Sequence, residues 1–199
     1  MRLLLVDGHY YAYRSFFAIQ GLKNSQGDPT NAVFGFVKAL RKMLADVKPD
    51  LAGVVWDAGL PERRMELLPS YKQQRDETPG DLEVQFSVIE EAVAALGLHN
   101  LSLKGHEADD LIASYAAEAR KENAEIVIAT NDKDIYSLVD AGTRIYSTNK
   151  SDVGEKKEGF SLLGAAEVEA KWGVPPERIP DVLALTGDSV DNIPGVDER

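Results

Sequence analysis

Short apolar runs that lead into acidic residues alternate along this chain with longer segments of helical spacing. The runs are residues 3–6, 51–56 and 126–129. Continuous apolar runs of this length are typical of strands that are buried on both faces of a sheet. Strands that alternate with helices predict a mostly parallel sheet with helices on both sides. The pattern therefore indicates an α/β fold.

Helical spacing is clearest over residues 31–47, where apolar side chains recur every three or four positions. Thr30 is the expected N-cap of this helix, and Pro49 lies just past its end. The other expected elements are a weak strand over 98–103 and helices over 84–96 (ended by Gly97), 107–123, 165–172 and 176–185. The polar stretches 58–81 and 148–159 are expected to be loops.

The composition excludes several classes of protein. The chain has 199 residues and no cysteine, so a disulfide framework, a zinc ribbon and a thiolate nucleophile are excluded. No apolar run approaches the roughly 20 residues that a membrane-spanning helix needs, and the sequence has no recognisable signal peptide. We therefore expect a protein of a reducing, cytoplasmic compartment without a membrane partner.

The charge balance bears on the kind of partner. The chain carries 22 basic and 33 acidic residues, which gives a formal net charge of −11 at pH 7. A protein that binds nucleic acid through phosphates normally presents a basic surface, so this charge alone argues against such a partner. The argument changes if the acids are gathered where metal ions neutralise them.

Nine acidic residues fall in five groups along the chain, and a parallel sheet would bring together those that follow its strands. They are Asp7, Asp57, Glu107, Asp109, Asp110, Asp132, Asp134, Asp188 and Asp191. Those that follow strands are expected at the carboxyl edge of the sheet, where ligands bind in such folds. Glu107 and Asp110 are three positions apart and share one face at the start of a helix. Asp188 and Asp191 lie in a glycine-containing segment near the last residue.

Each acidic group also has a purely structural interpretation. Acids in the first turn of a helix favour its dipole, an aspartate beside a glycine can form a turn, and Asp132 or Asp134 can cap a helix. Carboxylates crowded at one edge, however, repel each other unless protons or cations neutralise them. Carboxylates suit magnesium or manganese, and the absence of cysteine disfavours zinc. His9 and His106 lie beside acids and are expected to support ligands rather than to bind the metal.

Basic and aromatic residues are grouped after two of the expected strands. One group is Arg63, Arg64, Tyr71, Lys72 and Arg75, and the other is Tyr10, Tyr11, Tyr13, Arg14, Phe16 and Phe17. The first group can lean over the sheet edge and hold a phosphate, with a ring stacked on a base. The alternative for it is a solvated loop, because acids are interspersed there. In the second group, Phe16 and Phe17 can pack in the core or stack on bases.

These residues favour metal-assisted phosphoryl chemistry. Two divalent ions about 4 Å apart can activate a water and stabilise the leaving oxygen of a phosphodiester. The sequence contains neither a Gly-x-Ser-x-Gly motif nor a Walker A motif, which would indicate other chemistry.

An ordered series of motifs resembles one known family. The motifs are Asp7-Gly8-His9 with Tyr13-Arg14, Val55-Trp56-Asp57, Arg64 with Tyr71-Lys72-x-x-Arg75, Gly105-x-Glu107-Ala108-Asp109-Asp110, Asp132-Lys133-Asp134, and Leu183-Ala184-Leu185-x-Gly187-Asp188-x-x-Asp191-Asn192-Ile193-Pro194-Gly195. They are similar to those of the 5′ nuclease domain of bacterial DNA polymerase I, which is related to flap endonucleases. The resemblance covers nearly the whole chain and implies a PIN-like (resolvase-like) fold.

The resemblance implies a magnesium-dependent hydrolase that removes nucleotides from 5′ ends of DNA or cuts 5′ flaps, in replication and repair. It places the nine acids in two overlapping sites for two Mg²⁺ ions, for which Mn²⁺ can substitute. The residues that correspond to phosphate-steering positions are Lys72, Arg75 and Arg14, and those at substrate-binding positions are Arg64, Tyr71 and Tyr13. The implied partner is DNA with a 5′ flap, a nick or a 5′ end, or an RNA/DNA primer hybrid. The protein is expected to be a monomer, alone or within a longer polymerase chain.

The resemblance also implies a division of the chain. Residues 1–159 are expected to form the catalytic domain, with residues 58–81 as its clamp, and residues 160–199 to begin a helical DNA-binding extension. In the family, a helical hairpin that grips the duplex and binds a monovalent ion follows this point. The present sequence ends with Asp197-Glu198-Arg199 instead, so we expect a truncated extension, weak duplex affinity and no monovalent site. Arg63 replaces an aromatic residue and Asp76-Glu77 replace prolines, which affects the clamp rather than the chemistry.

Other functions remain to be weighed. A haloacid-dehalogenase-like phosphatase needs a second aspartate two positions after its nucleophile, but His9 stands there. A phosphorylatable receiver domain is shorter and leaves the acids of residues 107–110 and 188–191 unused. A non-catalytic module that binds DNA junctions and a PIN-type ribonuclease stay as alternatives.

Overall fold

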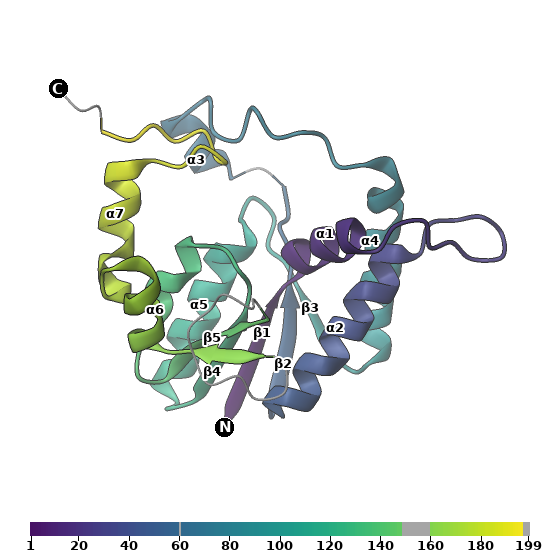
Figure 1. Cartoon of the computed structure of the whole chain (residues 1–199), viewed down its shortest axis with the longest axis horizontal. Coiled ribbons are helices and arrows are strands. Elements are labelled where there is room, and N and C mark those ends of the chain that lie inside the picture. Colours follow the sequence, from purple (N-terminus) through teal and green to yellow (C-terminus); the bar gives the residue numbers. More distant parts are fainter. Residues whose placement is uncertain (60, 149–159, 197–199) are drawn as a thin grey trace.

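The computed structural model describes residues 1–59, 61–148 and 160–196 (Figure 1). The predicted loop 148–159 therefore lies almost entirely outside the described residues. The described residues form one sheet with helices on both of its faces, as the alternating pattern predicts.

The sheet has the order β3-β2-β1-β4-β5-β6 within the described residues. Its strands are β1 (Arg2–Asp7), β2 (Leu51–Val55), β3 (His99–Leu101), β4 (Glu125–Ala129), β5 (Thr143–Ser147) and β6 (Ser161–Leu163). The first five strands run parallel, and β6 pairs antiparallel with β5. From β1 the strand order proceeds through β2 to β3 on one side and through β4 to β5 on the other. The order reverses between β1 and β4, and the carboxyl ends of these strands are where such folds bind ligands.

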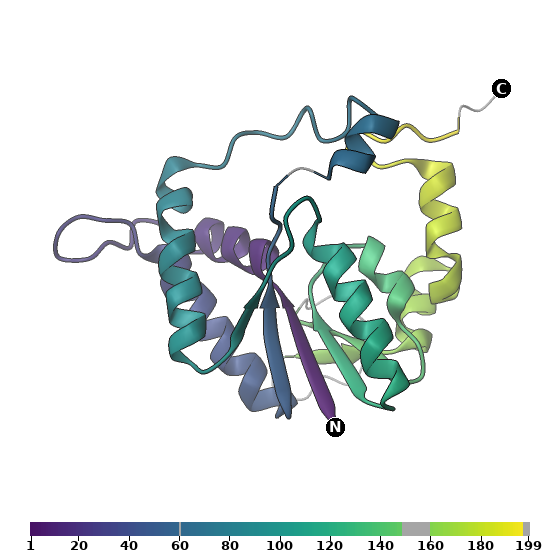
Figure 2. The same ribbon diagram turned by 180° about the vertical axis from the view of Figure 1, so that it is seen from behind.

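Helices cover the two faces and create two hydrophobic cores. On one face lie α1 (Gly8–Ala18), α2 (Asn31–Val47) and α4 (Gly80–Ala95), whose buried side chains pack with Leu4, Val6 and Trp56. The other face carries α5 (Ala108–Lys121), η1 (Asp134–Leu138), α6 (Ala165–Trp172), η2 (Pro176–Arg178) and α7 (Ile179–Thr186). A separate short helix, α3 (Glu62–Leu67), lies with the segment after α7 above the carboxyl ends of the strands (Figures 1 and 2).

Several predicted elements are confirmed in detail. The helices α2 and α6 have the predicted bounds, and Gly97 takes a positive φ of 76° after α4. Thr30 stands at the N-cap of α2, but its hydroxyl donates to the carbonyl of Leu22 at 3.5 Å instead of accepting from the helix. The predicted weak strand is shorter than expected, because β3 is an edge strand whose His99 and Asn100 are exposed.

Five described elements were not predicted: α1, α3, η1, β5 and β6. Aromatic side chains occur on several sides of α1, so it lacks a clear apolar stripe. The helix α3 has six residues and buries none of them, within the stretch predicted as a loop. The strand β6 joins the sheet just after residue 159, and the predicted division of the chain at that point stays a prediction.

Candidate metal centre and basic turn

The acidic residues converge at the carboxyl edge of the central strands. Asp7 is the last residue of β1, Asp57 follows β2 by two positions, and Asp132 and Asp134 follow β4. From above this edge, the start of α5 contributes Glu107, Asp109 and Asp110, and the turn after α7 contributes Asp188 and Asp191. Side chains from five separate segments thus meet where the strand order reverses.

Three of these acids are close enough to share a cation. Asp109, Asp132 and Asp134 each offer a carboxylate oxygen, and these oxygens lie within 4.8 Å of one another. Burial, followed by repulsion from Asp132, Asp7 and other acids, raises the pKa of Asp109 to about 8. Burial together with Asp132 also raises the pKa of Asp134. The protein therefore holds these carboxylates together at a cost in electrostatic free energy that a bound cation would remove.

Asp7 is held rigidly beside this group. Its side chain is buried and accepts hydrogen bonds from the amide of Tyr10 at 3.0 Å and from the hydroxyl of Thr130 at 2.9 Å. Its pKa is raised to about 6, mainly by burial and to a smaller extent by the charges of Asp57 and Asp132, while the two hydrogen bonds offset part of this rise. Asp7 is thus both the N-cap of α1 and a member of the acidic cluster, so that the structural and functional interpretations hold together.

Asp57 is fixed between two elements. Its Oδ1 accepts from the amide of Ala108 at 2.7 Å, and its own amide donates to Nδ1 of His9 at 3.2 Å. The ring of His9 packs against Trp56 and Phe86, and burial lowers its pKa. His9 therefore supports Asp57 as predicted. His106 contacts the carbonyl of Lys104 at 3.3 Å.

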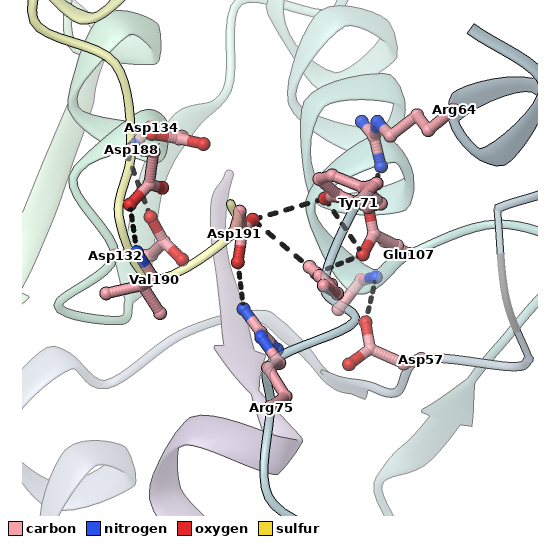
Figure 3. A network of polar contacts seen from close by, with 12 residues as sticks. Asp57, Arg64, Tyr71, Arg75, Glu107, Asp132, Asp134, Asp188, Val190 and Asp191 are labelled. Carbon is pink, nitrogen blue, oxygen red and sulfur yellow. Dashed lines mark hydrogen bonds and ion pairs between the residues drawn. The ribbon is translucent and has the colours of Figure 1, made fainter. Parts of the chain in front are cut away.

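A second part of the cluster is paired with cations of the chain itself. Arg64 contacts Glu107 and Asp110, Lys72 contacts Glu107 and Asp191, and Arg75 contacts Asp191. The hydroxyl of Tyr71 donates to Oε2 of Glu107 at 3.0 Å and to Oδ2 of Asp191 at 3.2 Å (Figure 3). The predicted basic group therefore does lean over the sheet edge. Arg63 is exposed and is not part of these contacts.

The segment 64–75, which we call the basic turn, is docked on the turn after α7. The amide of Lys72 donates to the carbonyl of Asp191 at 3.0 Å, and the side chain of Asn192 donates to the carbonyl of Ser70 at 2.8 Å. Lys72 itself takes a positive φ of 57°. These backbone contacts hold the cationic groups against the acids.

Two predicted site residues lie apart from the acids. The guanidinium of Arg14 contacts the hydroxyl of Tyr10 at 3.4 Å, and the hydroxyl of Tyr13 is 2.6 Å from that of Thr78. Phe16 packs against the core, whereas Phe17 is 62% exposed. Arg14 and Tyr13 therefore flank the centre on α1 rather than joining its contacts.

Sequence reasoning missed two groups that complete the centre. Thr130 is buried and orients Asp7, and Lys133 forms an ion pair with Asp188. Thr130 directly follows a predicted strand, which was an available signal. Lys133 lies between two predicted ligands, but the sequence does not show toward which acid its side chain turns.

The donor set fits hard divalent cations. All nine predicted side chains at this edge present carboxylate oxygens, and Asp109, Asp132 and Asp134 form a ready group of three. Oxygen-rich sites of this kind suit Mg²⁺, Mn²⁺ or Ca²⁺ better than Zn²⁺.

Comparison with known proteins defines the class to which this fold and centre belong. Residues 2–173 match the family described as "5'-3' exonuclease, N-terminal resolvase-like domain", and the chain belongs to this family. The chain is 44% identical over 195 residues to a thermostable DNA polymerase I of Thermus aquaticus, covering 98% of this chain and 22% of the polymerase. It is 37% identical over 195 residues to a 5'-3' exonuclease of Aquifex aeolicus, covering 98% of this chain and 64% of that protein. The chain thus spans about a fifth of the polymerases and about two thirds of the exonuclease.

Solved structures support the same fold. The T5 5'-exonuclease with bound divalent metal ions (zinc) superposes with a TM-score of 0.74 at 20% identity, over 100% of this chain and 71% of that one. The catalytic core of Rad2 in complex with a DNA substrate gives a TM-score of 0.59 at 18% identity, over 100% of this chain and 58% of that one. The expected PIN-like, resolvase-like fold is therefore confirmed. No helix in the described part of the chain is long and apolar enough to span a membrane.

Proposed function

We propose that this chain is a divalent-metal-dependent 5′ nuclease that hydrolyses DNA phosphodiester bonds at 5′ ends or 5′ flaps. The observation that carries the proposal is the meeting of nine carboxylates at one sheet edge, opposed by three basic side chains of the basic turn. Acids alone would suit a simple cation site. Cations placed directly over them match a phosphodiester that must lie between metal ions and positive charges.

We propose that two Mg²⁺ ions, replaceable by Mn²⁺, are held by the nine carboxylates. The ligands would be Asp7, Asp57, Glu107, Asp109, Asp110, Asp132, Asp134, Asp188 and Asp191. Bound divalent ions would supply an acidified water as nucleophile and positive charge against the developing charge on the phosphate.

The basic turn supplies the remaining positive charge. Lys72 and Arg75 would exchange their carboxylate partners for the oxygens of the scissile phosphate once ions neutralise Glu107 and Asp191. Arg64 would bind an adjacent phosphate, and Tyr71 would orient Glu107 through its hydroxyl. On α1, Arg14 and Tyr13 would bind the DNA strand on the 5′ or the 3′ side of the scissile phosphodiester bond. The exposed Phe17 lies beside Tyr13 and extends this aromatic surface.

The partners follow from this chemistry. DNA with a 5′ flap, a nick or a 5′ end, or an RNA/DNA primer hybrid, would place its 5′ strand under the basic turn. We propose a cytoplasmic bacterial protein that works in replication and repair as a monomer or as part of a longer polymerase chain. The formal charge of −11 suits this role only when ions are bound, because the acids otherwise repel phosphates.

The test is cleavage of a 5′-flap DNA duplex in Mg²⁺, in Mn²⁺ and in EDTA. We expect a 5′-phosphorylated product in either metal and none in EDTA. The variant Asp109→Ala should bind the same DNA and give no product, since it removes one member of the group of three acids.

Two controls separate the alternatives. An RNA flap of the same sequence that is cut faster than the DNA flap would favour a ribonuclease. Metal-independent binding of the junction with no cleavage in either metal would favour a non-catalytic binding module. Both outcomes contradict the proposed nuclease.

A further inference from the structure

The turn that carries Asp188 and Asp191 is a small closed unit. The backbones of Asp188 and Ile193 exchange two hydrogen bonds, both of 2.8 Å. Gly187 takes a φ of 73°, and a Cβ there would lie 2.3 Å from the amide of Gly195. The turn, residues 187–195, is therefore internally fixed, and its placement over the sheet depends on contacts with other elements.

Those contacts come from two sides. On one side lies the basic turn: Lys72 and Arg75 contact Asp191, and the side chain of Asn192 donates to the carbonyl of Ser70. On the other side, the ammonium of Lys133 pairs with Oδ2 of Asp188. Lys133 is the residue just before η1, between Asp132 and Asp134, so this ion pair connects the turn to the segment after β4. Figure 3 shows Asp188 beside Asp132 and Asp134, with Asp191 directed toward Tyr71 and Arg75.

We propose that Lys133 is a positioning residue that holds the turn 187–195 against η1, so that Asp188 faces Asp134 in the metal centre. The inference rests on the proposed function and assigns a role within the same site. Without a cation at this point, Asp132, Asp134 and Asp188 would repel one another and push the turn outward. The ammonium offsets this repulsion before any ion is present.

The orientation of Asp188 supports the same role. Its Oδ2 pairs with Lys133 and its Oδ1 accepts from the amide of Val190 at 2.9 Å, so both oxygens are fixed. An ionised carboxylate has about four lone-pair sites, and these two contacts leave the others for a metal ion. Asp188 is therefore presented as an oriented ligand.

The direction in which Lys133→Met changes the affinity for a divalent cation tests this role. If Lys133 only competed with metal ions, Lys133→Met would raise the affinity for a divalent cation. If Lys133 positions the turn, the same change lowers that affinity even though it removes a positive charge. The size expected is about tenfold, the lower end of the effect of groups that orient metal ligands.

The experiment counts bound Mn²⁺ by electron paramagnetic resonance on wild type, Lys133→Met, Lys133→Arg and Lys121→Met. Lys121 is an exposed lysine at the end of α5, so Lys121→Met removes the same charge far from the turn. We expect weaker Mn²⁺ binding in Lys133→Met, recovery in Lys133→Arg, and no change in Lys121→Met. Hydrogen exchange without metal should accelerate at the amides of residues 188–193 in Lys133→Met, with the strands of the sheet unaffected.

The outcomes are distinct. Unchanged or tighter Mn²⁺ binding in Lys133→Met, or unchanged exchange in residues 188–193, overturns the positioning role while leaving the nuclease proposal intact. If wild type binds no Mn²⁺ at all, the proposed function fails, and the exchange measurement still decides whether Lys133 holds the turn.

Discussion

Gly8, the first residue of α1, lies against the indole ring of Trp56, where even one methyl group has no room. A Cβ at Gly8 would lie 2.4 Å from Cε3 of Trp56. Trp56 is 3% exposed and stacks on Phe36, so it cannot move aside. We expect Gly8→Ala to lower the free energy of unfolding by about 1–3 kcal/mol through overpacking.

Urea unfolding in EDTA measures this change. Gly80→Ala is the matched control, because a Cβ at that position, the first residue of α4, meets no atom within 4 Å. The control should be neutral or slightly stabilising. Equal effects of the two substitutions would contradict the packing argument.

Asp109 is the acid whose charge the metal-free protein tolerates least. Because burial and four neighbouring acids raise its pKa to about 8, Asp109→Asn should stabilise the metal-free protein at pH 8. We expect a gain on the order of 1 kcal/mol, or about 2–4 °C in Tm for a domain of this size. Flap cleavage should fall by at least about 100-fold, as one ligand of the group of three is lost.

Thermal unfolding in EDTA and in Mg²⁺ checks this expectation. Asp76→Asn, which removes an exposed acid near the basic turn, serves as the control and should leave the Tm unchanged. A lower Tm of Asp109→Asn in EDTA would show that the carboxylate stabilises the fold, contrary to the repulsion argument.

Residue identities alone were sufficient to predict which acids meet at the sheet edge, but only some of the residues that support these acids. Asp7, Asp57 and Asp132 follow apolar runs, and the geometry of a parallel sheet brings strand ends together. The contact of Lys133 with Asp188 joins positions 55 residues apart in sequence, and only the folded chain decides which nearby acid the lysine meets. Thr130 is likewise positioned by packing rather than by a motif, whereas the support that His9 gives to Asp57 was predicted.

At the level of elements, long amphipathic segments were predictable and short ones were not. The helix α2 has 17 residues and a continuous apolar stripe that fixes its bounds. The strand β6 has three residues, too few to show an alternation of apolar and polar side chains. It is a strand because it pairs with the free edge of β5. The sequence pattern of a helix or strand becomes clearer as the element lengthens. A short strand can pair with a neighbouring strand without any such pattern in its own sequence.

As an element, the basic turn is expected to oppose metal binding in the absence of substrate. Lys72 and Arg75 occupy oxygens of Glu107 and Asp191 that are proposed metal ligands. Removing one of these cations should therefore raise the affinity for Mn²⁺, the opposite of the sign expected at Lys133. We expect Lys72→Met to bind Mn²⁺ several-fold more tightly, because Glu107 loses a cation that competes with the metal ion for its oxygens.

The same substitution should reduce flap cleavage, because the phosphate loses a cation in the transition state. Calorimetric titration with Mn²⁺ and cleavage rates measured on one preparation give both quantities. Arg63→Met is the control. Arg63 is exposed on the helix α3, so this substitution removes the same charge without removing a contact to the acids. Weaker Mn²⁺ binding in Lys72→Met would indicate that Lys72 also orients its carboxylates.

In the whole molecule, mutually repelling acids lie at the edge of a sheet whose two faces are well packed. Two cores, one on each face of the sheet, hold β1 and β4 side by side, and the acids project from their ends. The packing free energy of the two cores offsets the repulsion among the acids. The global stability of the metal-free protein should therefore depend on pH in a direction set by the acids with raised pKa.

The sign follows from proton binding. Asp109 has a pKa of about 8 in the folded protein and about 3.9 when unfolded, so the folded state binds more protons between these values. Its contribution to stability is complete below about pH 4 and is lost as the pH rises through 8. Asp7, with a folded pKa of about 6, acts in the same direction at lower pH, where the lowered pKa of His9 acts in the opposite direction.

The window from pH 7 to pH 9 therefore isolates Asp109, because Asp7 and His9 have largely completed their titrations by then. We expect the free energy of unfolding in EDTA to fall by about 1 kcal/mol or more across this window. Saturating Mg²⁺ should remove the fall, since bound cations favour the ionised carboxylates, and Asp109→Asn should flatten it without metal. Urea titrations at four pH values in this range measure it, and a stability that stays level or rises in EDTA would contradict the raised pKa of Asp109.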